Sequence, residues 1–377
     1  MSGRTCARLL WLYLLLACES PSTVPSTEAE PAAGSLVGRP RLELLDELER
    51  WTAASDPIGC ELLVLEDGEL LFWEAAGWSD PEREIPWRRG RICRIRSLTK
   101  PFVATLALQL VAEGRLDLDA SILGGLFDDL DPAAEQITVR QLLTQTAGFD
   151  QPGYPGELTA YRSLREVAEA IVQRGPTFVP GTVFLYSDAN TMLLGAVIES
   201  LTERPLAEVL EERILRPLGL KETLLDWSED DPRAAKMVPT YRMTQTGTEA
   251  YWTPGQPQLV PWFRASGGLY SSAEDLATFL TAWADPSDAR LGVPPDSRVV
   301  ARSPSAPSRF SPASAYGMHW QIFETMQPPG FGHTGSDGTI AWVDPAHDRI
   351  VIYLSQTRGT QSIARVPNLV TRVLEGR

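Results

Sequence analysis

The order of strand-like and helix-like segments along this chain constrains its fold more than any other feature. Strand-like segments lie near both ends, at 60–66, 69–75, 91–96, 315–323, 338–345 and 349–357. Between the two groups, apolar residues recur at helical spacing in six segments, 103–113, 137–144, 163–173, 190–201, 206–215 and 273–284. The pattern predicts an α+β fold: an antiparallel sheet from about 41–100 and 310–377, flanked by helices, with a large inserted all-helical lobe at about 101–309. The boundary between sheet and lobe is then the expected functional site.

Local signals at the two ends of the folded part support this architecture. The apolar residues of 42–51 recur at helical spacing, which predicts an amphipathic helix at its start. Asp67-Gly68 separates the first two strand-like segments and provides the positive φ angles of a two-residue hairpin turn. The segment 363–376 predicts a closing helix.

The charge and motif content exclude several classes of function. A formal net charge of −15 repels phosphate backbones, and no basic patch offsets it, so nucleic acid is not expected as a partner. The three histidines, at 319, 333 and 347, lack the short spacings of a zinc site. Glycines at 330, 332 and 335 formally match a dinucleotide fingerprint, but a strand-like segment follows them instead of a helix. We therefore expect neither a metal nor a cofactor.

The first residues have the pattern of an export signal. Arg4 and Arg8 precede an apolar run at 9–17, which is too short to cross a bilayer but suits the core of a secretory signal. Residues 15–18 resemble a bacterial lipobox, in which Cys18 is lipidated and anchors the protein to a membrane. The alternative is a plain signal peptide at 1–18 with a coincidental cysteine. Residues 19–40, rich in Pro, Ser, Thr and Glu, are expected to form a disordered tether, so the sequence predicts an exported bacterial lipoprotein with its folded domain at 41–377.

Two cysteines remain for the folded domain if Cys6 is removed with the signal and Cys18 carries lipid. Cys60 and Cys93 both lie in strand-like segments, and an export compartment allows oxidation. They are expected either as a disulfide or as two separate buried thiols, and the sequence favours neither arrangement.

A serine and a lysine three residues apart suggest nucleophilic chemistry. Lys100 is one of only three lysines among 34 Lys and Arg residues. At helical spacing Ser97 and Lys100 share a face, and Pro101 is tolerated only in a first helical turn, so Ser97 is expected at or beside a helix start. The positive end of the helix dipole would lower the pKa of Lys100. Arginine cannot release its proton in a protein whereas a desolvated lysine can, so this pair is suited to activating a serine.

Two later segments complete a family pattern. Tyr186 follows a Pro-Gly turn and precedes a helix-like segment, and the tripeptide H-T-G stands at 333–335, at the edge of a late strand. With S-L-T-K at 97–100, these stretches resemble the three motifs of serine penicillin-recognising enzymes: S-x-x-K, Y-x-N, and the H-T-G variant of K-T-G. The segments 137–149 and 264–280 also resemble the group of class C β-lactamases, D,D-peptidases and related esterases.

This resemblance, which spans about residues 41–370, implies a β-lactamase/transpeptidase-like fold and an acyl-enzyme mechanism. Ser97 would attack a carbonyl, and Lys100 and Tyr186 would share the general-base and general-acid work. The backbone N–H groups of Ser97 and Ser336 would form the oxyanion hole. Which of Lys100 and Tyr186 is the base stays open. The implied substrate-binding residues are Asp188, His333, Thr334 and Gly335.

The chain departs from the family pattern at two positions. Asp188 stands where the family usually has Asn, and Asn190 lies out of register for the motif. An ionised Asp188 near Lys100 would raise the pKa of the lysine, hold it charged, and repel a substrate carboxylate. His333 stands where many relatives have Lys, and with a reference pKa near 6.5 it is largely neutral at pH 7. Both departures favour a neutral substrate over a β-lactam.

The expected function is therefore an exported serine hydrolase that acts through an acyl-enzyme on a small ester or on a D-amino-acid peptide or amide. A β-lactamase is the alternative among enzymes. The alternative from another class is a penicillin- or peptidoglycan-binding sensor that deacylates slowly, or a scaffold without catalysis. The sequence does not indicate an oligomeric state.

Overall fold

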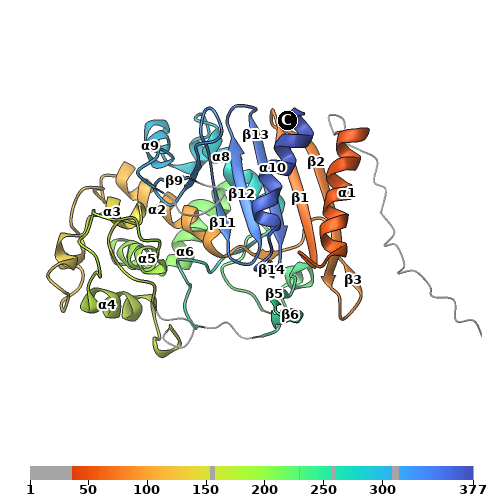
Figure 1. The fold of residues 1–377 in the computed structure, drawn as a ribbon. Coiled ribbons are helices and arrows are strands. Elements are labelled where there is room, and N and C mark those ends of the chain that lie inside the picture. Colours follow the sequence, from red (N-terminus) through yellow and green to blue (C-terminus); the bar gives the residue numbers. More distant parts are fainter. Residues whose placement is uncertain (1–35, 153–157, 229, 257–259, 308–313, 377) are drawn as a thin grey trace, which may run out of the picture. The chain divides into compact units, whose positions relative to one another are not determined.

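The computed structural model describes residues 36–152, 158–228, 230–256, 260–307 and 314–376 (Figure 1). The predicted signal segment 1–18, Cys18 and residues 19–35 of the predicted tether lie outside these residues. Helix α1 (Arg39–Ala53) has Pro40 in its first turn, where the missing N–H of proline costs nothing. No helix in the described part of the chain is long and apolar enough to cross a membrane.

One nine-stranded sheet forms the centre of the fold, and every pairing in it is antiparallel. In spatial order its strands are β3 (Ile85–Pro86), β2 (Glu69–Asp80), β1 (Gly59–Glu66), β13 (Arg349–Ser355), β12 (Thr339–Asp344), β11 (Gly330–Gly335), β10 (Gln321–Phe323), β9 (Ala315–Tyr316) and β8 (Ala306–Pro307). The pairing of β1 with β13 joins the two ends of the chain, as the sequence predicts. Asp67 and Gly68 have φ angles of 52° and 76° and turn β1 into β2.

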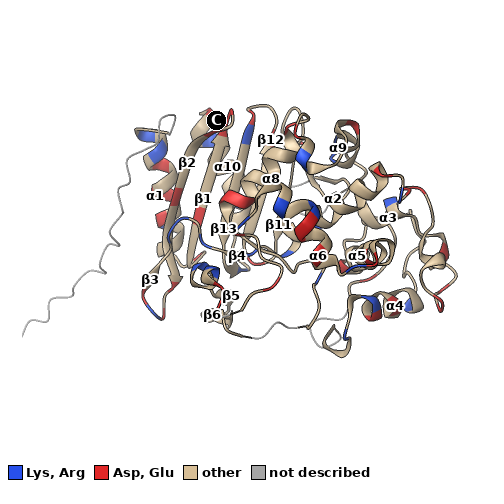
Figure 2. Ribbon diagram, turned by 180° about the vertical axis from the view of Figure 1, so that it is seen from behind, with Lys and Arg blue, Asp and Glu red and all other residues tan. Residues whose placement is uncertain are grey.

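Helices cover both faces of this sheet. Helix α1 and the closing helix α10 (Ser362–Glu375) share one apolar cluster with Val351 and Tyr353 of β13. The alternate residues Ile350, Ile352 and Leu354 point into the second cluster, together with helix α8 (Ala273–Ala284), which Figure 2 shows crossing the sheet. A strand buried on both faces needs apolar residues at consecutive positions, which explains the continuous apolar run of β13.

The helices of the middle segment are α2 (Thr99–Ala112), α3 (Val139–Leu143), α4 (Leu164–Arg174), α5 (Asp188–Thr202), α6 (Leu206–Leu210), the π-helical turn η5 (Glu211–Leu215), α7 (Arg216–Leu218) and α9 (Pro295–Ala301). The 3-10 turns are η1 (Arg96–Leu98), η2 (Leu123–Gly125), η3 (Ala134–Gln136), η4 (Leu158–Ala160), η6 (Pro232–Lys236) and η7 (Ala289–Leu291). Each helix predicted for this segment is present. Helix α2 is buried on nearly all sides, so it forms the centre of the larger core.

The prediction that 101–309 is all-helical was wrong in its details. Strands β5 (Thr240–Thr244) and β6 (Gly247–Trp252) lie in this segment and pair with each other, and β5 also pairs with β14 (Thr357–Arg358). Strand β7 (Tyr270–Ser271) pairs with β4 (Cys93–Arg94). The hairpin was missed because most of its side chains face solvent, which leaves no apolar alternation to detect. The predicted strand 91–96 shortens to β4, outside the large sheet, because its last residue starts the turn η1.

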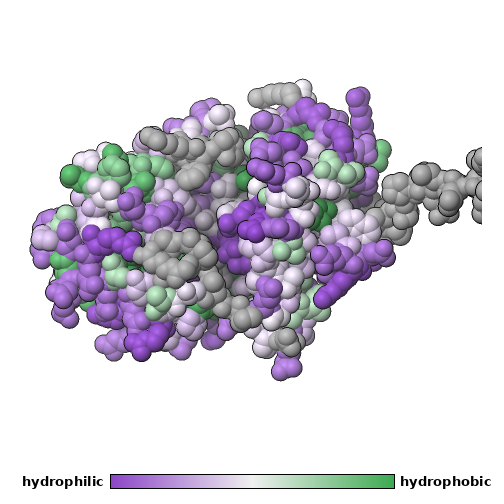
Figure 3. All heavy atoms as spheres, turned by 60° about the horizontal axis from the view of Figure 1, so that its bottom comes forward, coloured by the Kyte–Doolittle hydropathy of each residue, from purple (hydrophilic) through white to green (hydrophobic). Residues whose placement is uncertain are grey.

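The two cysteines of the described chain are separate free thiols, so the disulfide expectation is not met. Cys60 lies in the apolar cluster under α1 and α10, whereas Cys93 belongs to the cluster on the other side of the sheet. The sheet therefore separates the two sulfur atoms. Outside these cores, Figure 3 shows a surface that is hydrophilic over much of the visible face, as the acidic composition suggests.

Candidate active site

The structure brings the predicted serine and lysine together at a helix start. Ser97 lies in the 3-10 turn η1, which continues directly into α2. Lys100, in the first turn of α2, places its Nζ 3.1 Å from Ser97 Oγ. Ser97 is half-buried, whereas Lys100 is fully buried. The hydroxyl thus stays open to a substrate while the amine beneath it is shielded from water.

Two further segments converge on the lysine. Asp188 begins helix α5 and accepts a hydrogen bond from Lys100 Nζ at 2.7 Å through its Oδ1. The carbonyl of Ser266, from the loop before β7, accepts another at 3.0 Å. The Tyr186 ring also lies beside the ammonium, with its centroid 4.7 Å from Nζ. Residues separated by up to 166 positions therefore surround one buried cation.

The charges of this cluster stabilise each other. Burial by itself lowers the pKa of Lys100, but the neighbouring Asp188 and Tyr186 outweigh it, and the net pKa lies above its usual value. Burial raises the pKa of Asp188, yet attraction from Lys100 and Arg264 prevails and lowers it. The two groups form a buried ion pair at neutral pH. The expected effect of Asp188 on the lysine is confirmed, and the expected lowering by the helix dipole is wrong because a full negative charge in contact outweighs a partial one.

Tyr186 is a neutral phenol in the resting site. Burial raises its pKa, although Lys100 and hydrogen bonds to Lys100 and Ser97 act in the opposite direction. The ring is half-buried and packs edge-on against Tyr316, with the centroids 6.0 Å apart. This packing holds the phenol next to the nucleophile.

His333 is placed behind the site and does not face a substrate. Only 1% of its surface is exposed, and burial together with the charge of Lys100 lowers its pKa to about 3. Its Nδ1 lies 2.7 Å from the Thr334 carbonyl, which can only accept, so Nδ1 carries the proton. Its Nε2 then accepts from the Tyr316 hydroxyl at 3.1 Å. The expectation of a neutral histidine is confirmed, but the expectation that its side chain binds substrate is not, because the imidazole is enclosed by aromatic rings.

The end of β11 lies against the nucleophile turn. A Cβ on Gly335 would lie 2.4 Å from the Ile95 carbonyl oxygen and 2.2 Å from Thr339 Oγ1, so only glycine allows this approach. The contact brings the exposed Ser336 next to the turn that carries Ser97. Thr334, before the glycine, is partly exposed and is held by Gln321, whose amide donates to Thr334 Oγ1 at 3.0 Å. The predicted residues 334–336 therefore lie next to the turn that carries Ser97.

A loop that the sequence reasoning left without a chemical role completes the site. The segment 264–269 supplies the Ser266 carbonyl and binds the turn η1 through a hydrogen bond of 3.1 Å from Ile95 N to the Leu269 carbonyl. A Cβ on Gly267 would lie 2.6 Å from Arg264 Nη2 and 3.4 Å from the carbonyl carbon of Arg96, so the Arg264 guanidinium lies close to the peptide before Ser97. The resemblance marked this segment, but no spacing rule links it to the lysine.

Asn190, which is out of register for the family motif, has a structural role. It is fully buried, and its Nδ2 donates to Gln145 Oε1 at 2.6 Å. The same Oε1 accepts from Ser187 N at 2.9 Å, which fixes the start of α5. Asn190 therefore holds the helix that presents Asp188.

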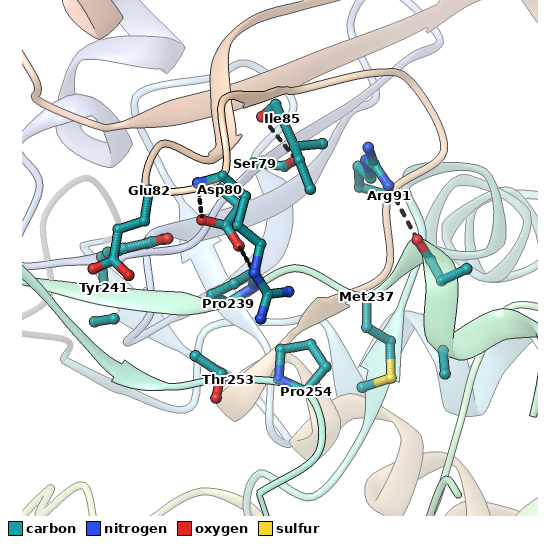
Figure 4. Close-up of a pocket in the computed structure, with 14 residues that line it drawn as sticks. Ser79, Asp80, Glu82, Ile85, Arg91, Met237, Pro239, Tyr241, Thr253 and Pro254 are labelled. Carbon is teal, nitrogen blue, oxygen red and sulfur yellow. Dashed lines mark hydrogen bonds and ion pairs between the residues drawn. The ribbon is translucent and has the colours of Figure 1, made fainter. Parts of the chain in front are cut away.

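A cavity and an acidic cluster lie elsewhere. The cavity in Figure 4, of about 230 Å³, is lined by residues of β2, β3, β5 and β6 and by the segment that precedes β4, and Ser97 does not line it. In the described chain, Asp344, His347 and Glu375 lie close enough together to hold an ion. Arg349, however, already places Nη1 3.2 Å from Glu375 and 3.7 Å from Asp344 and so supplies the positive charge there.

Comparisons with known proteins show the family and the fold of this chain. The family model described as Beta-lactamase matches residues 46–374. A putative D-alanyl-D-alanine carboxypeptidase of Escherichia coli O157:H7 is 27% identical, over 92% of this chain and 90% of that protein. The octameric penicillin-binding protein homologue from Pyrococcus abyssi is 23% identical, with a TM-score of 0.76 over 88% of this chain and 78% of that one. The D-amino acid amidase from Ochrobactrum anthropi SV3 is 23% identical, with a TM-score of 0.73 over 89% of this chain and 98% of that one. With this fold and a family match over most of its length, the chain belongs to the Beta-lactamase family and is an enzyme of the serine hydrolase type.

Proposed function

We propose that this protein hydrolyses a small ester, or a D-amino-acid amide or peptide, through an acyl-enzyme on Ser97. The observation that carries the proposal is the 3.1 Å contact between Ser97 Oγ and a buried lysine that Asp188 keeps charged. The partly exposed Thr334 and the exposed Ser336 lie at the end of β11, which packs against the turn that carries Ser97. A buried, charged lysine in contact with an accessible serine hydroxyl is typical of a catalytic site. A purely structural lysine would be expected to pair with its carboxylate away from an accessible hydroxyl.

We assign the base role to Tyr186. Loss of a proton from Lys100 would leave the buried Asp188 carboxylate without its partner, which is costly in a low dielectric. Loss of a proton from Tyr186 leaves that ion pair intact and adds an attraction between the phenolate and the ammonium. Because Lys100 can only donate to Ser97 Oγ, the serine proton is free to point toward the phenol oxygen.

The reaction then follows from these positions. Tyr186 first releases its own proton to solvent. The phenolate then takes the Ser97 proton as Oγ bonds to the substrate carbonyl carbon, and the N–H groups of Ser97 and Ser336 stabilise the oxyanion. The bond to the leaving group breaks, and Tyr186 returns the proton to that group. Water, activated by the same phenolate, hydrolyses the acyl-enzyme and releases a carboxylic acid.

The charges of the site support a substrate without a negative charge near the acyl group. Asp188 is ionised and lies beside the nucleophile, and His333 is neutral and enclosed. The relatives named above as a carboxypeptidase and an amidase support a peptide or amide of a D-amino acid as one substrate class. We further propose that the protein is exported and anchored through Cys18, on the strength of the N-terminal sequence pattern alone.

The test compares wild type with Ser97→Ala on p-nitrophenyl acetate, a D-amino-acid amide and a chromogenic cephalosporin. We expect Ser97→Ala to lose about 10⁴-fold or more of kcat on the ester and amide, because no other group can form the acyl-enzyme. The exposed Ser287→Ala, in the loop after α8, serves as the matched control and should retain full activity. Equal activity in wild type and Ser97→Ala would refute the proposal.

Intact-protein mass after mixing with an ester and a penicillin distinguishes the alternatives. Rapid return to the free mass with the ester supports a hydrolase. A persistent adduct would instead indicate a slowly deacylating sensor, and fast turnover of the cephalosporin would indicate a β-lactamase.

A further inference from the structure

We propose that a buried ion pair between Arg96 and Asp337, closed by Tyr251 and Arg358, is a positioning device that sets the separation of the two oxyanion-hole N–H groups. The inference rests on the proposed acyl-enzyme function and deepens it. It assigns a role to residues that the family motifs do not include. Below, these four residues are called the clamp.

The ion pair is buried and short. Arg96 Nε donates to Asp337 Oδ2 at 2.5 Å. Asp337 is fully buried and Arg96 is 7% exposed. Burial raises the pKa of Asp337, but Arg96 and Arg358 outweigh it and lower the net value, so the carboxylate is ionised. Charge-assisted hydrogen bonds of this kind are directional and therefore fix the relative position of the groups they join.

The position of the pair in the chain gives it a specific effect. Arg96 immediately precedes Ser97, and Asp337 immediately follows Ser336. The ion pair thus joins the residue before Ser97 to the residue after Ser336, and Ser97 and Ser336 are the two residues whose N–H groups would bind the oxyanion. Arg96 also adopts a φ of 53°, in the left-handed region that a residue with a Cβ avoids. Such a conformation persists only where surrounding contacts impose it, and the pair with Asp337 is such a contact.

The two other members of the clamp come from the three-stranded sheet formed by β14, β5 and β6. The Tyr251 hydroxyl, on β6, donates to Asp337 Oδ1 at 2.5 Å and accepts from Arg96 Nη2 at 3.1 Å. Arg358, on β14, donates from Nε to Asp337 Oδ1 at 3.0 Å and from Nη2 to Ser336 Oγ at 2.8 Å. Two of the four clamp residues therefore come from this sheet, and the β5–β6 hairpin contributes to the clamp through Tyr251.

The clamp contributes more to the geometry of the oxyanion hole than to the stability of the fold. Replacing a buried ion pair by apolar residues is often neutral for stability, so a pair in this place needs another explanation. An oxyanion donor must lie within about 2.7–3.1 Å of the developing charge. A displacement of about 1 Å at a reacting group can cost on the order of 100-fold in rate.

The test uses Tyr251→Phe, Asp337→Asn and Arg96→Lys. Tyr251→Phe removes one hydroxyl from a partly buried position and should fold. We expect kcat on p-nitrophenyl acetate to fall about tenfold in Tyr251→Phe and about 100-fold in Asp337→Asn, with KM changed less than about threefold. Arg96→Lys keeps the charge but not the two-pronged donor, and should recover part of the loss that Arg96→Ala shows.

The end of β13 in the nine-stranded sheet offers a control. Arg349 is 3% exposed and donates from Nε to Glu66 at 2.7 Å, away from the reaction site. Arg349→Lys and Glu66→Gln disturb a buried arginine that is paired with a partly exposed carboxylate. They should lower the melting temperature and leave kcat unchanged.

The affinity of a boronic acid, which forms a tetrahedral adduct with Ser97, is a measurement that does not change when only the stability of the fold is lowered. Its Kd should rise about as much as kcat falls in each clamp variant, because both depend on the oxyanion hole. The inference would be overturned if folded Tyr251→Phe kept the wild-type kcat and boronate affinity. It would also be overturned if Arg349→Lys lost as much kcat as the clamp variants do. A Ser97-independent wild-type activity would instead refute the proposed function, so the two failures are distinguishable.

Discussion

Asp188 decides the ionisation of the whole catalytic cluster. It is 9% exposed, and its contact with Lys100 reverses the effect of burial on the lysine pKa. Asn at this position would donate or accept hydrogen bonds without charge and would leave the desolvation of the lysine uncompensated. One residue thus selects between a charged and a neutral lysine beneath Ser97.

Asp188→Asn should therefore introduce an ionisation into the pH dependence of kcat/KM. Without the carboxylate, burial is the dominant influence on Lys100, and its pKa falls. If the phenolate of Tyr186 is the base and the ammonium of Lys100 must be present, kcat/KM rises with pH below the lowered lysine pKa and levels off above it, whereas in wild type it continues to rise. The profile is measured with p-nitrophenyl acetate between pH 5 and 9.

The pH at which the profile levels off tests the control of the lysine by Asp188. A profile identical to wild type would show that Asp188 does not control the lysine. In neither protein should His333 add an inflection near pH 6.5, since its pKa is lowered to about 3.

At the scale of elements, β1 carries a buried acid that the proposed reaction does not use. Glu61 is fully buried, and its Oε2 accepts from Gly90 N at 3.0 Å. Burial raises its pKa to about 8, despite the hydrogen bond from Gly90 that favours the charged form. The carboxyl is therefore protonated in the folded protein at pH 7, and β1 keeps a neutral, hydrogen-bonded group in its core.

This carboxyl makes the folded protein less stable as pH rises. The unfolded chain, with a glutamate pKa of about 4.3, releases the proton first, so the free energy of unfolding falls between about pH 4 and pH 8. Glu61→Gln should remove this dependence and gain on the order of a few kcal/mol over wild type at pH 8, with little gain at pH 4. Urea unfolding at both pH values measures the difference.

Glu69→Gln, at the exposed start of β2, is the control for that measurement. It should leave the pH dependence of wild type unchanged. An equal stability change at pH 4 and pH 8 in Glu61→Gln would mean that the carboxyl is not protonated in the fold.

At the scale of the whole molecule, the sheet separates two apolar cores, and each contains one thiol. Burial raises the pKa of Cys60 to about 12 and that of Cys93 well above its usual value. Both thiols should resist iodoacetamide in the native protein and react after unfolding in guanidinium. Peptide mass mapping of the full chain separates them from Cys6 and Cys18. Modification of either one in the native state, or a Cys60–Cys93 disulfide, would contradict this arrangement.

The sequence was sufficient where the relevant contact is local or periodic. Ser97 and Lys100 meet because residues three apart share a helix face, and the β1–β2 hairpin follows from Asp67-Gly68. The joining of β1 to β13 was also predictable, since strand-like segments lie at both ends of the folded part and helix-like segments lie between them. The exposed β5–β6 hairpin was missed because half-exposed strands lack the apolar signal.

The sequence by itself determined the contact between Ser97 and Lys100 and a sheet built from both ends of the chain. The tertiary structure decided the ionisation of the lysine, the enclosure of His333, and the clamp that joins Arg96 to Asp337 across 241 positions. The physical reason is that helical spacing and strand alternation are encoded within a few residues. Burial and charge pairing depend on segments that come together only when the chain has folded.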